Sequence, residues 1–174
     1  MYICQTYGII IIIDHAALSA VLRKENDMSE KVTRRQWREV AFLLIFEKQF
    51  IDSTLDEIIE DAKSVYTDDG DELYRLIASP DEFAVTLAKG ACGKQEEADE
   101  IIKRNLKGWT IDRISKVSLA ILRMAVYEMM YMDDIPVNVS INEAVELAKK
   151  YAADDDFAFI NGTLGSVSRD IKEQ

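Results

Sequence analysis

From residue 33 onward, apolar residues recur every three or four positions, which is the spacing of one face of an α-helix. Thr33 and Gln36 have capping-box spacing at the start of the first such segment. Period-two alternation of useful length is absent from the sequence. The pattern predicts an all-α fold of about seven helices. After the first, which begins at Thr33 and ends near Phe46, the expected helices cover about 52–66, 80 to 90 or 93, 95–106, 111–132, 140–151 and the residues after about 154.

Local signals refine several of these boundaries. Ser79-Pro80-Asp81-Glu82 combines a cap residue, a proline at the first helical position and an early acid. Ser140 and Glu143 have capping-box spacing and predict a helix that begins just after Ser140. The segment 111–132 is apolar around most of its circumference, which is typical of a central helix. Residues 67–72 are expected to form an acidic loop.

Residues 1–27 do not share the helical pattern. Their apolar run, Ile9–Ile13, is too short to span a bilayer, and no positive charge precedes it as in a signal peptide. We expect Met28 to be the native start, with 1–27 a non-native or poorly ordered extension and 28–174 one helical domain. The alternative is that 1–27 form a strand or helix docked on that domain.

Charge and residue usage limit the possible chemistry. The formal net charge of −11 argues against a general affinity for nucleic acid, so any such binding needs a local patch or a basic partner. His15 is the only histidine, and Cys4 and Cys92 have no metal or redox spacing. We therefore expect a cytoplasmic protein without a metal or cofactor.

Against this acidic background, three arginines begin the first helix: Arg34, Arg35 and Arg38. Cations at a helix N-terminus oppose the helix dipole and cost a few tenths of a kcal/mol each. The functional interpretation is that they hold an anion, most simply RNA phosphate. The alternative is a solvated basic patch that balances neighbouring glutamates.

Several sequence blocks together resemble the transcription antitermination factor NusB family in order and spacing. The resemblance implies two small helical bundles that share a core, and binding of boxA RNA from ribosomal operons together with ribosomal protein NusE. It also implies action within the RNA polymerase antitermination complex, and a homodimer in some members. The blocks are Arg34–Ala41, Arg113–Val117, Ile121–Glu128, Ile141–Lys149 and Phe159–Leu164.

The resemblance also assigns RNA-binding positions in the first helix. The basic arm of the family corresponds to Arg34, Arg35 and Arg38, while Gln36 stands where some members have arginine. Phe46 corresponds to an aromatic residue at the end of that helix, where it could stack on a base. The alternative for Phe46 is a place in the hydrophobic core.

Further positions lie near the last helix. Asp155 and Phe159 match an acidic and an aromatic position that face RNA in the family. Phe159 could stack on a base or belong to the core. Ser118 stands where the family would place an acidic side chain at the NusE contact. The basic residues within 103–107 are either a solvated helix face or an extension of the RNA path.

Other classes of function find less support in the sequence. The acidic cluster at 68–72 lacks EF-hand spacing, and the chain has no P-loop, dinucleotide-binding turn or nucleophile elbow, so we expect no enzymatic activity. One alternative is a stand-alone rRNA-binding domain related to the N-terminal part of an rRNA cytosine methyltransferase. The chain ends where the cofactor domain of such an enzyme would begin, which favours the free-standing factor. A protein–protein scaffold is the other alternative.

Overall fold

A computed structural model describes residues 32–65 and 72–172 of this chain, all within one compact unit, Val32–Gln174. These residues form eight α-helices and one short 3₁₀ helix, with no strand among them. The all-α prediction is therefore confirmed. The expectations for 1–27 lie outside the described residues.

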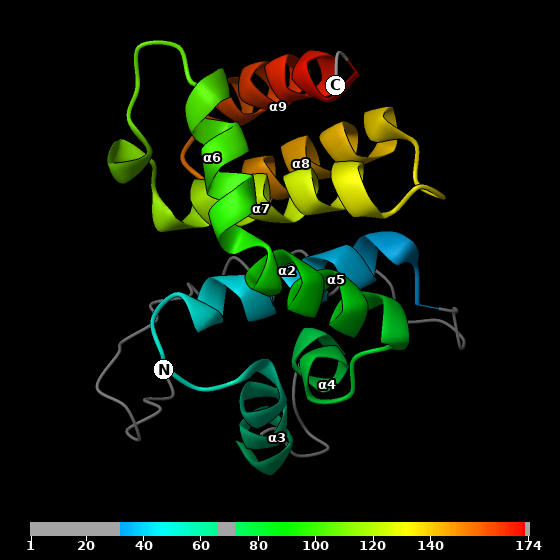
Figure 1. Cartoon of the computed structure of the whole chain (residues 1–174). Coiled ribbons are helices and arrows are strands. Elements are labelled where there is room, and N and C mark those ends of the chain that lie inside the picture. Colours follow the sequence, from blue (N-terminus) through cyan, green and yellow to red (C-terminus); the bar gives the residue numbers. More distant parts are fainter. Residues whose placement is uncertain (1–31, 66–71, 173–174) are drawn as a thin grey trace. The chain divides into compact units, whose positions relative to one another are not determined.

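The first four described helices pack together in the lower half of Figure 1. Helix α2 contacts the other three, and α3 also packs against α4. Helix α4 is the shortest of them. The helices are α2 (Arg34–Lys48), α3 (Leu55–Val65), α4 (Glu72–Ala78) and α5 (Glu82–Gly93).

The second group fills the upper half of the same view. Helix α8 packs against α7 and α9, while α6 lies across α7 and α9. The connection from α6 to α7 contains a short 3₁₀ helix, η1. The elements are α6 (Gln95–Asn105), η1 (Ile111–Arg113), α7 (Lys116–Tyr131), α8 (Val137–Tyr151) and α9 (Asp156–Lys172).

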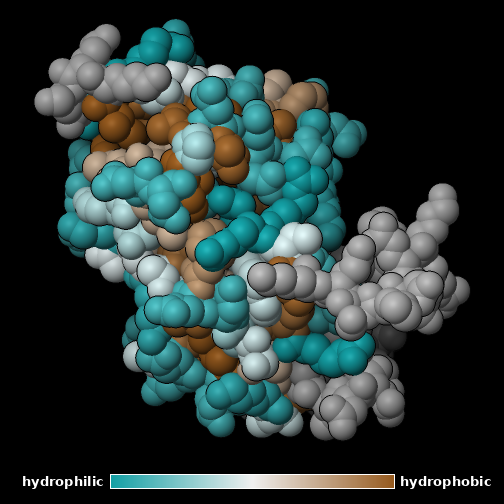
Figure 2. Space-filling model, turned by 90° about the vertical axis from the view of Figure 1, so that its right-hand side faces the viewer, coloured by the Kyte–Doolittle hydropathy of each residue, from teal (hydrophilic) through white to brown (hydrophobic). Residues whose placement is uncertain are grey.

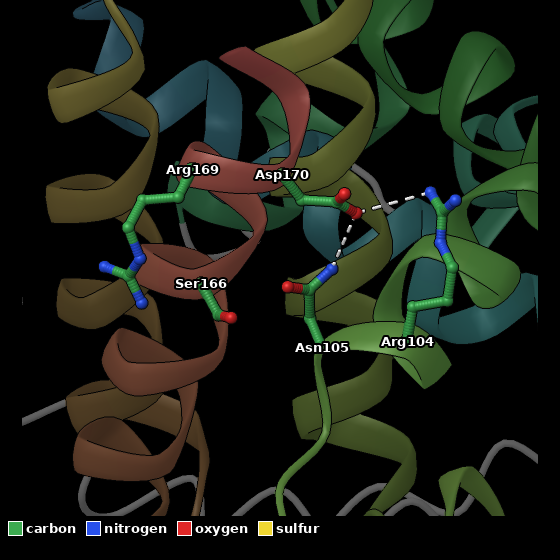
Figure 3. A pocket seen from close by; sticks show the side chains of 5 residues that line it. All are labelled: Arg104, Asn105, Ser166, Arg169 and Asp170. Atoms are coloured by element: carbon green, nitrogen blue, oxygen red, sulfur yellow. Dashed lines mark hydrogen bonds and ion pairs between the residues drawn. The ribbon is translucent and has the colours of Figure 1, made fainter. Parts of the chain in front are cut away.

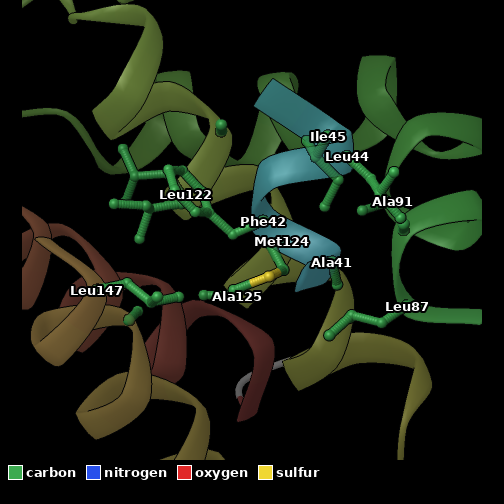
Figure 4. Close-up of a cluster of buried hydrophobic side chains, with 14 of the residues drawn as sticks. Ala41, Phe42, Leu44, Ile45, Leu87, Ala91, Leu122, Met124, Ala125 and Leu147 are labelled. Carbon is green, nitrogen blue, oxygen red and sulfur yellow. The ribbon is translucent and has the colours of Figure 1, made fainter. Parts of the chain in front are cut away.

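Helix α7 joins the two groups, because it contacts α2 and α5 as well as α8 and α9. Figure 4 shows the resulting cluster, with Phe42 and Leu44 of α2 beside Leu87 of α5, Leu122 of α7 and Leu147 of α8. All five side chains are buried. The predicted arrangement of two small bundles around a shared core, with a central helix, is thus confirmed.

Helix starts agree with the sequence at α2 and α6 and differ at several others, α3 included, which begins at Leu55 and not at about 52. The Thr33–Gln36 capping box forms as predicted. Helix α5 is capped by Asp81, whose carboxylate accepts from the Ala84 amide at 2.8 Å, and not by the serine two residues earlier. Helix α7 begins at Lys116, five residues later than predicted, because η1 occupies the preceding residues.

Helix α8 begins at Val137, directly after Pro136, so the predicted cap at Ser140 is wrong. Proline fixes its own φ and suits a helix start, which sets the first turn earlier than the Ser140 spacing indicated. Ser140 instead lies buried inside the helix, and its hydroxyl finds no hydrogen-bond partner within the described part of the chain.

The surface is predominantly hydrophilic on the face drawn in Figure 2, with apolar side chains visible between polar ones. None of the helices within 32–65 and 72–172 is both long and apolar enough to cross a membrane.

Candidate functional site

The N-terminus of α2 is organised by its cap. The Thr33 hydroxyl accepts from the Gln36 amide at 3.3 Å, and the Gln36 side-chain oxygen accepts from the Thr33 amide at 2.8 Å. Gln36 is therefore occupied in closing the first turn, which gives this residue a structural role at a position where some members of the resembled family carry arginine. The cap fixes the backbone on which the predicted basic arm stands.

Arg34 and Arg35 are both exposed but have different partners. Arg35 forms a bidentate ion pair with Glu143 of α8, with Nε to Oε2 at 3.0 Å and Nη2 to Oε1 at 2.8 Å. The hydrogen bonds and charge of Glu143 raise the pKa of Arg35 above its already high usual value. Arg34 lies with its Cζ 4.2 Å from the centre of the Phe83 ring, and no carboxylate pairs with it among the described residues. Arg34 is thus the cation of the arm that is free to meet an anion.

The third arginine of the predicted arm is directed into the protein. Arg38 is 5% exposed, and its Nε lies 2.7 Å from Oε1 of Glu128, which is 1% exposed. Its guanidinium also lies 5.4 Å from the centre of the Phe83 ring. The solvent-facing part of the arm therefore consists of Arg34 and Arg35, and the geometry does not place Arg38 with them.

Phe46 belongs to a row of aromatic rings that runs along the second half of α2 and just past its end. Its ring centre lies 6.1 Å from that of Phe42 in the core and 5.0 Å from that of Phe50, in an edge-to-face arrangement. Phe46 is half-buried and Phe50 is 41% exposed. Phe46 therefore packs partly into the core and also borders solvent. Its position is compatible with both alternatives that the sequence offered, a core residue and a stacking residue.

The C-terminal end of α8 lies beside α2 and leads through a short turn into α9. Lys150 donates to the carboxylate of buried Glu39 at 2.5 Å, and the Tyr151 hydroxyl also donates to it. The Tyr151 ring lies 5.1 Å from that of Phe42. These contacts position the turn that carries exposed Asp155, just before the first residue of α9.

Phe159 is half-buried, and its ring centre lies 6.0 Å from that of Trp109. Trp109 is 51% exposed and lies in the connection between α6 and η1. Trp109 was not predicted as a site residue because this connection carries no helical periodicity. A sequence signal did exist: Trp109 is a large aromatic residue outside any predicted apolar stripe, and aromatic residues are enriched at interfaces with partners.

Ser118 is buried at the start of α7, and its hydroxyl donates to Asp156 Oδ2 at 2.6 Å. The hydroxyl of Ser115, the cap of α7, lies 3.4 Å from the same oxygen. Asp156, the first residue of α9, therefore places its carboxylate directly beside Ser118. Ser118 is the position at which the resembled family would carry an acidic side chain.

Two of the three basic residues near the end of α6, Lys103 and Arg104, are paired. Figure 3 shows Arg104 and Asn105 directed at Asp170 of α9, at 3.3 Å and 3.0 Å, while Arg169 points away from Asp170. Lys103 pairs with Glu100 within its own helix at 2.7 Å. This network joins α6 to α9 and favours the solvated-face interpretation for Lys103 and Arg104.

One carboxylate near the aromatic row carries a perturbed pKa. Burial, with a smaller contribution from the charge of Asp61, raises the pKa of Glu47 in the last turn of α2. A group with a raised folded-state pKa weakens the fold as the pH rises through that value. We expect Glu47→Gln to raise the midpoint of thermal unfolding at pH 7, with the gain vanishing below the usual carboxyl pKa of about 4.3. Calorimetry at the two pH values measures this, and an equal difference at both would contradict it.

Within the described residues, no group of three or more His, Cys, Asp or Glu side chains could hold a metal ion.

Comparison with known proteins agrees with the resemblance. Transcription antitermination protein NusB of Acetivibrio thermocellus is 45% identical over 134 residues, covering 77% of this chain and 87% of that protein. NusB of Clostridium botulinum (strain Loch Maree) is 41% identical over 140 residues, covering 78% of this chain and 99% of that protein.

Solved structures show the same fold. NusB of T. maritima superposes with a TM-score of 0.65 at 30% identity, covering 80% of this chain and 93% of that one. A chain from a crystal structure of antitermination factors NusB and NusE in complex with dsRNA gives a TM-score of 0.62 at 26% identity, covering 79% and 96%. The family model described as NusB family matches residues 35–169. The chain therefore belongs to the NusB family.

Proposed function

We propose that this protein is a transcription antitermination factor that binds boxA RNA of ribosomal operons together with ribosomal protein NusE. Membership of the NusB family over 35–169 is the observation that carries the proposal. The similar chain from the complex of NusB, NusE and dsRNA supports the same pair of partners. The proposed setting is the RNA polymerase antitermination complex in the cytoplasm, because transcription takes place there.

The proposed RNA contacts begin at the arm. Arg34 contacts phosphate directly, supported by its exposure and by the Phe83 ring beneath its guanidinium. Arg35 contributes a second contact while Glu143 fixes its orientation. Arg38 positions the arm through Glu128 and does not itself touch RNA.

The aromatic and acidic residues complete the proposed RNA path. Phe46 stacks on a base at the end of α2. Phe159 offers a second stacking surface at the start of α9, and exposed Asp155 accepts hydrogen bonds from base amino groups. The protein reads bases with these residues and holds the backbone with the arm.

In this proposal NusE supplies the positive charge that this acidic chain lacks. A chain with a formal charge of −11 repels RNA phosphates outside its local basic patch. A basic ribosomal protein bound beside the patch would increase counterion release and affinity. The carboxylate of Asp156, held by Ser118, takes the role of the acidic group at the NusE contact.

The alternatives are less well supported. The relatives described above are named for antitermination and not for a reaction, which favours a regulator over the domain of a methyltransferase. A protein–protein scaffold would bind NusE without salt-sensitive RNA binding. The homodimer expected for some members stays a prediction.

The test is fluorescence anisotropy of a labelled boxA-type RNA, titrated with and without NusE at two salt concentrations. We expect NusE to tighten binding and each lost phosphate contact to reduce the slope of log affinity against log salt by about 0.7. Arg34→Ala with Arg35→Ala should therefore reduce that slope by roughly twice this amount and weaken binding. Lys63→Ala, which removes an exposed cation on α3, is the matched control. Unchanged affinity in the double variant would reject the arm, and an absence of RNA binding by the parent protein would reject the proposed function.

A further inference from the structure

An aromatic and cationic patch borders solvent where the α6–α7 connection passes the start of α9. We define it by Trp109, Phe159 and Arg113. The Trp109 and Phe159 ring centres are 6.0 Å apart, with planes inclined by 48°. The Arg113 Cζ lies 5.1 Å from the centre of the Trp109 ring. Three separate elements, the loop, α9 and η1, thus converge on one surface.

Phe159 packs partly against the hydrophobic core, whereas the exposure of Trp109 is not explained by the stability of the monomer. A buried aromatic side chain contributes a large apolar area to a core, whereas Trp109 is 51% exposed. Gly108, directly before it, has a φ of 74°, a left-handed conformation that glycine adopts without steric cost. The backbone turns at Gly108, and the indole of Trp109 that follows is half exposed to solvent.

The charge beside the indole suits an anionic ligand. Arg113 is exposed and forms no ion pair with a carboxylate among the described residues. Lys107, two residues before Trp109, is also exposed and without an ion pair in that part of the chain. Aromatic faces next to unpaired cations are the combination that single-stranded nucleic acids require, because bases stack while phosphates are neutralised.

We propose that Trp109 extends the stacking surface of Phe159, so that the two rings hold neighbouring bases of single-stranded RNA while Arg113 contacts the adjoining phosphate. This rests on the proposed function and adds two residues to its RNA path. The 48° inclination between the rings requires the two bases to be splayed from one another. Single-stranded RNA adopts such an arrangement readily, whereas a continuous duplex does not.

The two tryptophans of the chain make the test direct, since Trp37 is half-buried on α2 and Trp109 is exposed. Titration with an unlabelled boxA-type RNA should quench the fluorescence of the parent protein. The quenching should saturate at the concentration found by anisotropy of the labelled RNA. Trp109→Phe should abolish the quenching while keeping most of the affinity, because phenylalanine retains a stacking face. Trp37→Phe should leave the quenching in place.

Affinity measurements supply the second readout. Trp109→Ala should weaken RNA binding by roughly 5- to 150-fold, the equivalent of about 1–3 kcal/mol per stacked base. Arg113→Ala should reduce the salt slope by about 0.7, and Arg113→Lys should restore it. Lys63→Ala again serves as the control for loss of one exposed cation. Circular dichroism checks that each variant keeps its helical content.

The outcomes distinguish a failure of this inference from a failure of the proposed function. If RNA binds and neither the fluorescence nor the Trp109→Ala affinity changes while the Arg34 and Arg35 variants lose affinity, the inference is wrong and the proposed function stands. If Trp109→Ala loses NusE binding but keeps RNA binding, the patch contacts protein and the inference is again wrong. If the parent protein binds no RNA with or without NusE, the inference and the proposed function are both wrong.

Discussion

Replacing Glu128 with glutamine should lower the free energy of unfolding by about 3–5 kcal/mol, as expected when one partner of a buried ion pair is removed. Glu128 and Arg38 are 1% and 5% exposed, with Nε and Oε1 2.7 Å apart. Glutamine has nearly the same shape but no charge, so the arginine would remain buried without its counter-ion. Denaturation with urea, monitored by circular dichroism, measures the loss.

Two comparisons isolate the buried charge. The double variant Arg38→Met and Glu128→Met removes both charges and should recover most of the lost stability, because apolar replacements of buried pairs are often neutral or better. Glu60→Gln, which breaks an exposed pair with Lys63, should cost less than about 1 kcal/mol. A Glu128→Gln loss as small as that of Glu60→Gln would show that water reaches the buried pair.

This pair also affects how RNA-binding data should be interpreted. Arg34 and Arg38 lie over the same Phe83 ring, at 4.2 Å and 5.4 Å from its centre. An Arg38→Ala variant that binds RNA poorly would therefore not prove phosphate contact, since it leaves the Glu128 carboxylate buried alone. Only the exposed positions, Arg34 and Arg35, test the arm directly.

The sequence predicted those helices whose apolar stripe and cap agree, and it missed boundaries set by other causes. At α2 the Thr33 cap and the periodicity coincide, and the helix begins where expected. Helix α4 was not predicted, because it spans only seven residues and buries one of them, Ile77. The spacing at Ser140 matched a capping box, yet Pro136 sets the start of α8.

The candidate site, too, was predicted only in part. The sequence does not distinguish between the three arginines of the arm, Arg34, Arg35 and Arg38. Only their packing in the fold shows that the first two are exposed and the third is buried. A cue did exist: Glu128 lies within a long segment that is apolar around most of its circumference, and a carboxylate buried there needs a cationic partner. Trp109 could not be joined to Phe159 from sequence, because about 50 positions separate them and no periodicity spans the loop.

Gly90→Ala should destabilise the protein by about 1–3 kcal/mol, although alanine is by propensity the better helix residue by about 1 kcal/mol. Helices α5 and α7 approach closely at this residue. A Cβ added at Gly90 would overlap Cζ and the hydroxyl oxygen of Tyr127, well inside van der Waals contact. The ring cannot yield freely, because it also stacks on Tyr131 with ring centres 5.1 Å apart.

Gly93, three residues later in the same helix, is the matched control, since nothing lies within 4 Å of an added Cβ there. Gly93→Ala should be neutral or stabilise the protein by up to about 1 kcal/mol. In a double-mutant cycle, Gly90→Ala should cost much less once Tyr127 is replaced by alanine, with a coupling energy of about 1 kcal/mol or more. If Gly90→Ala instead proves as stable as Gly93→Ala, Tyr127 must swing toward solvent at little cost. The close approach of α5 and α7 would then follow from the aliphatic core alone and not from the glycine.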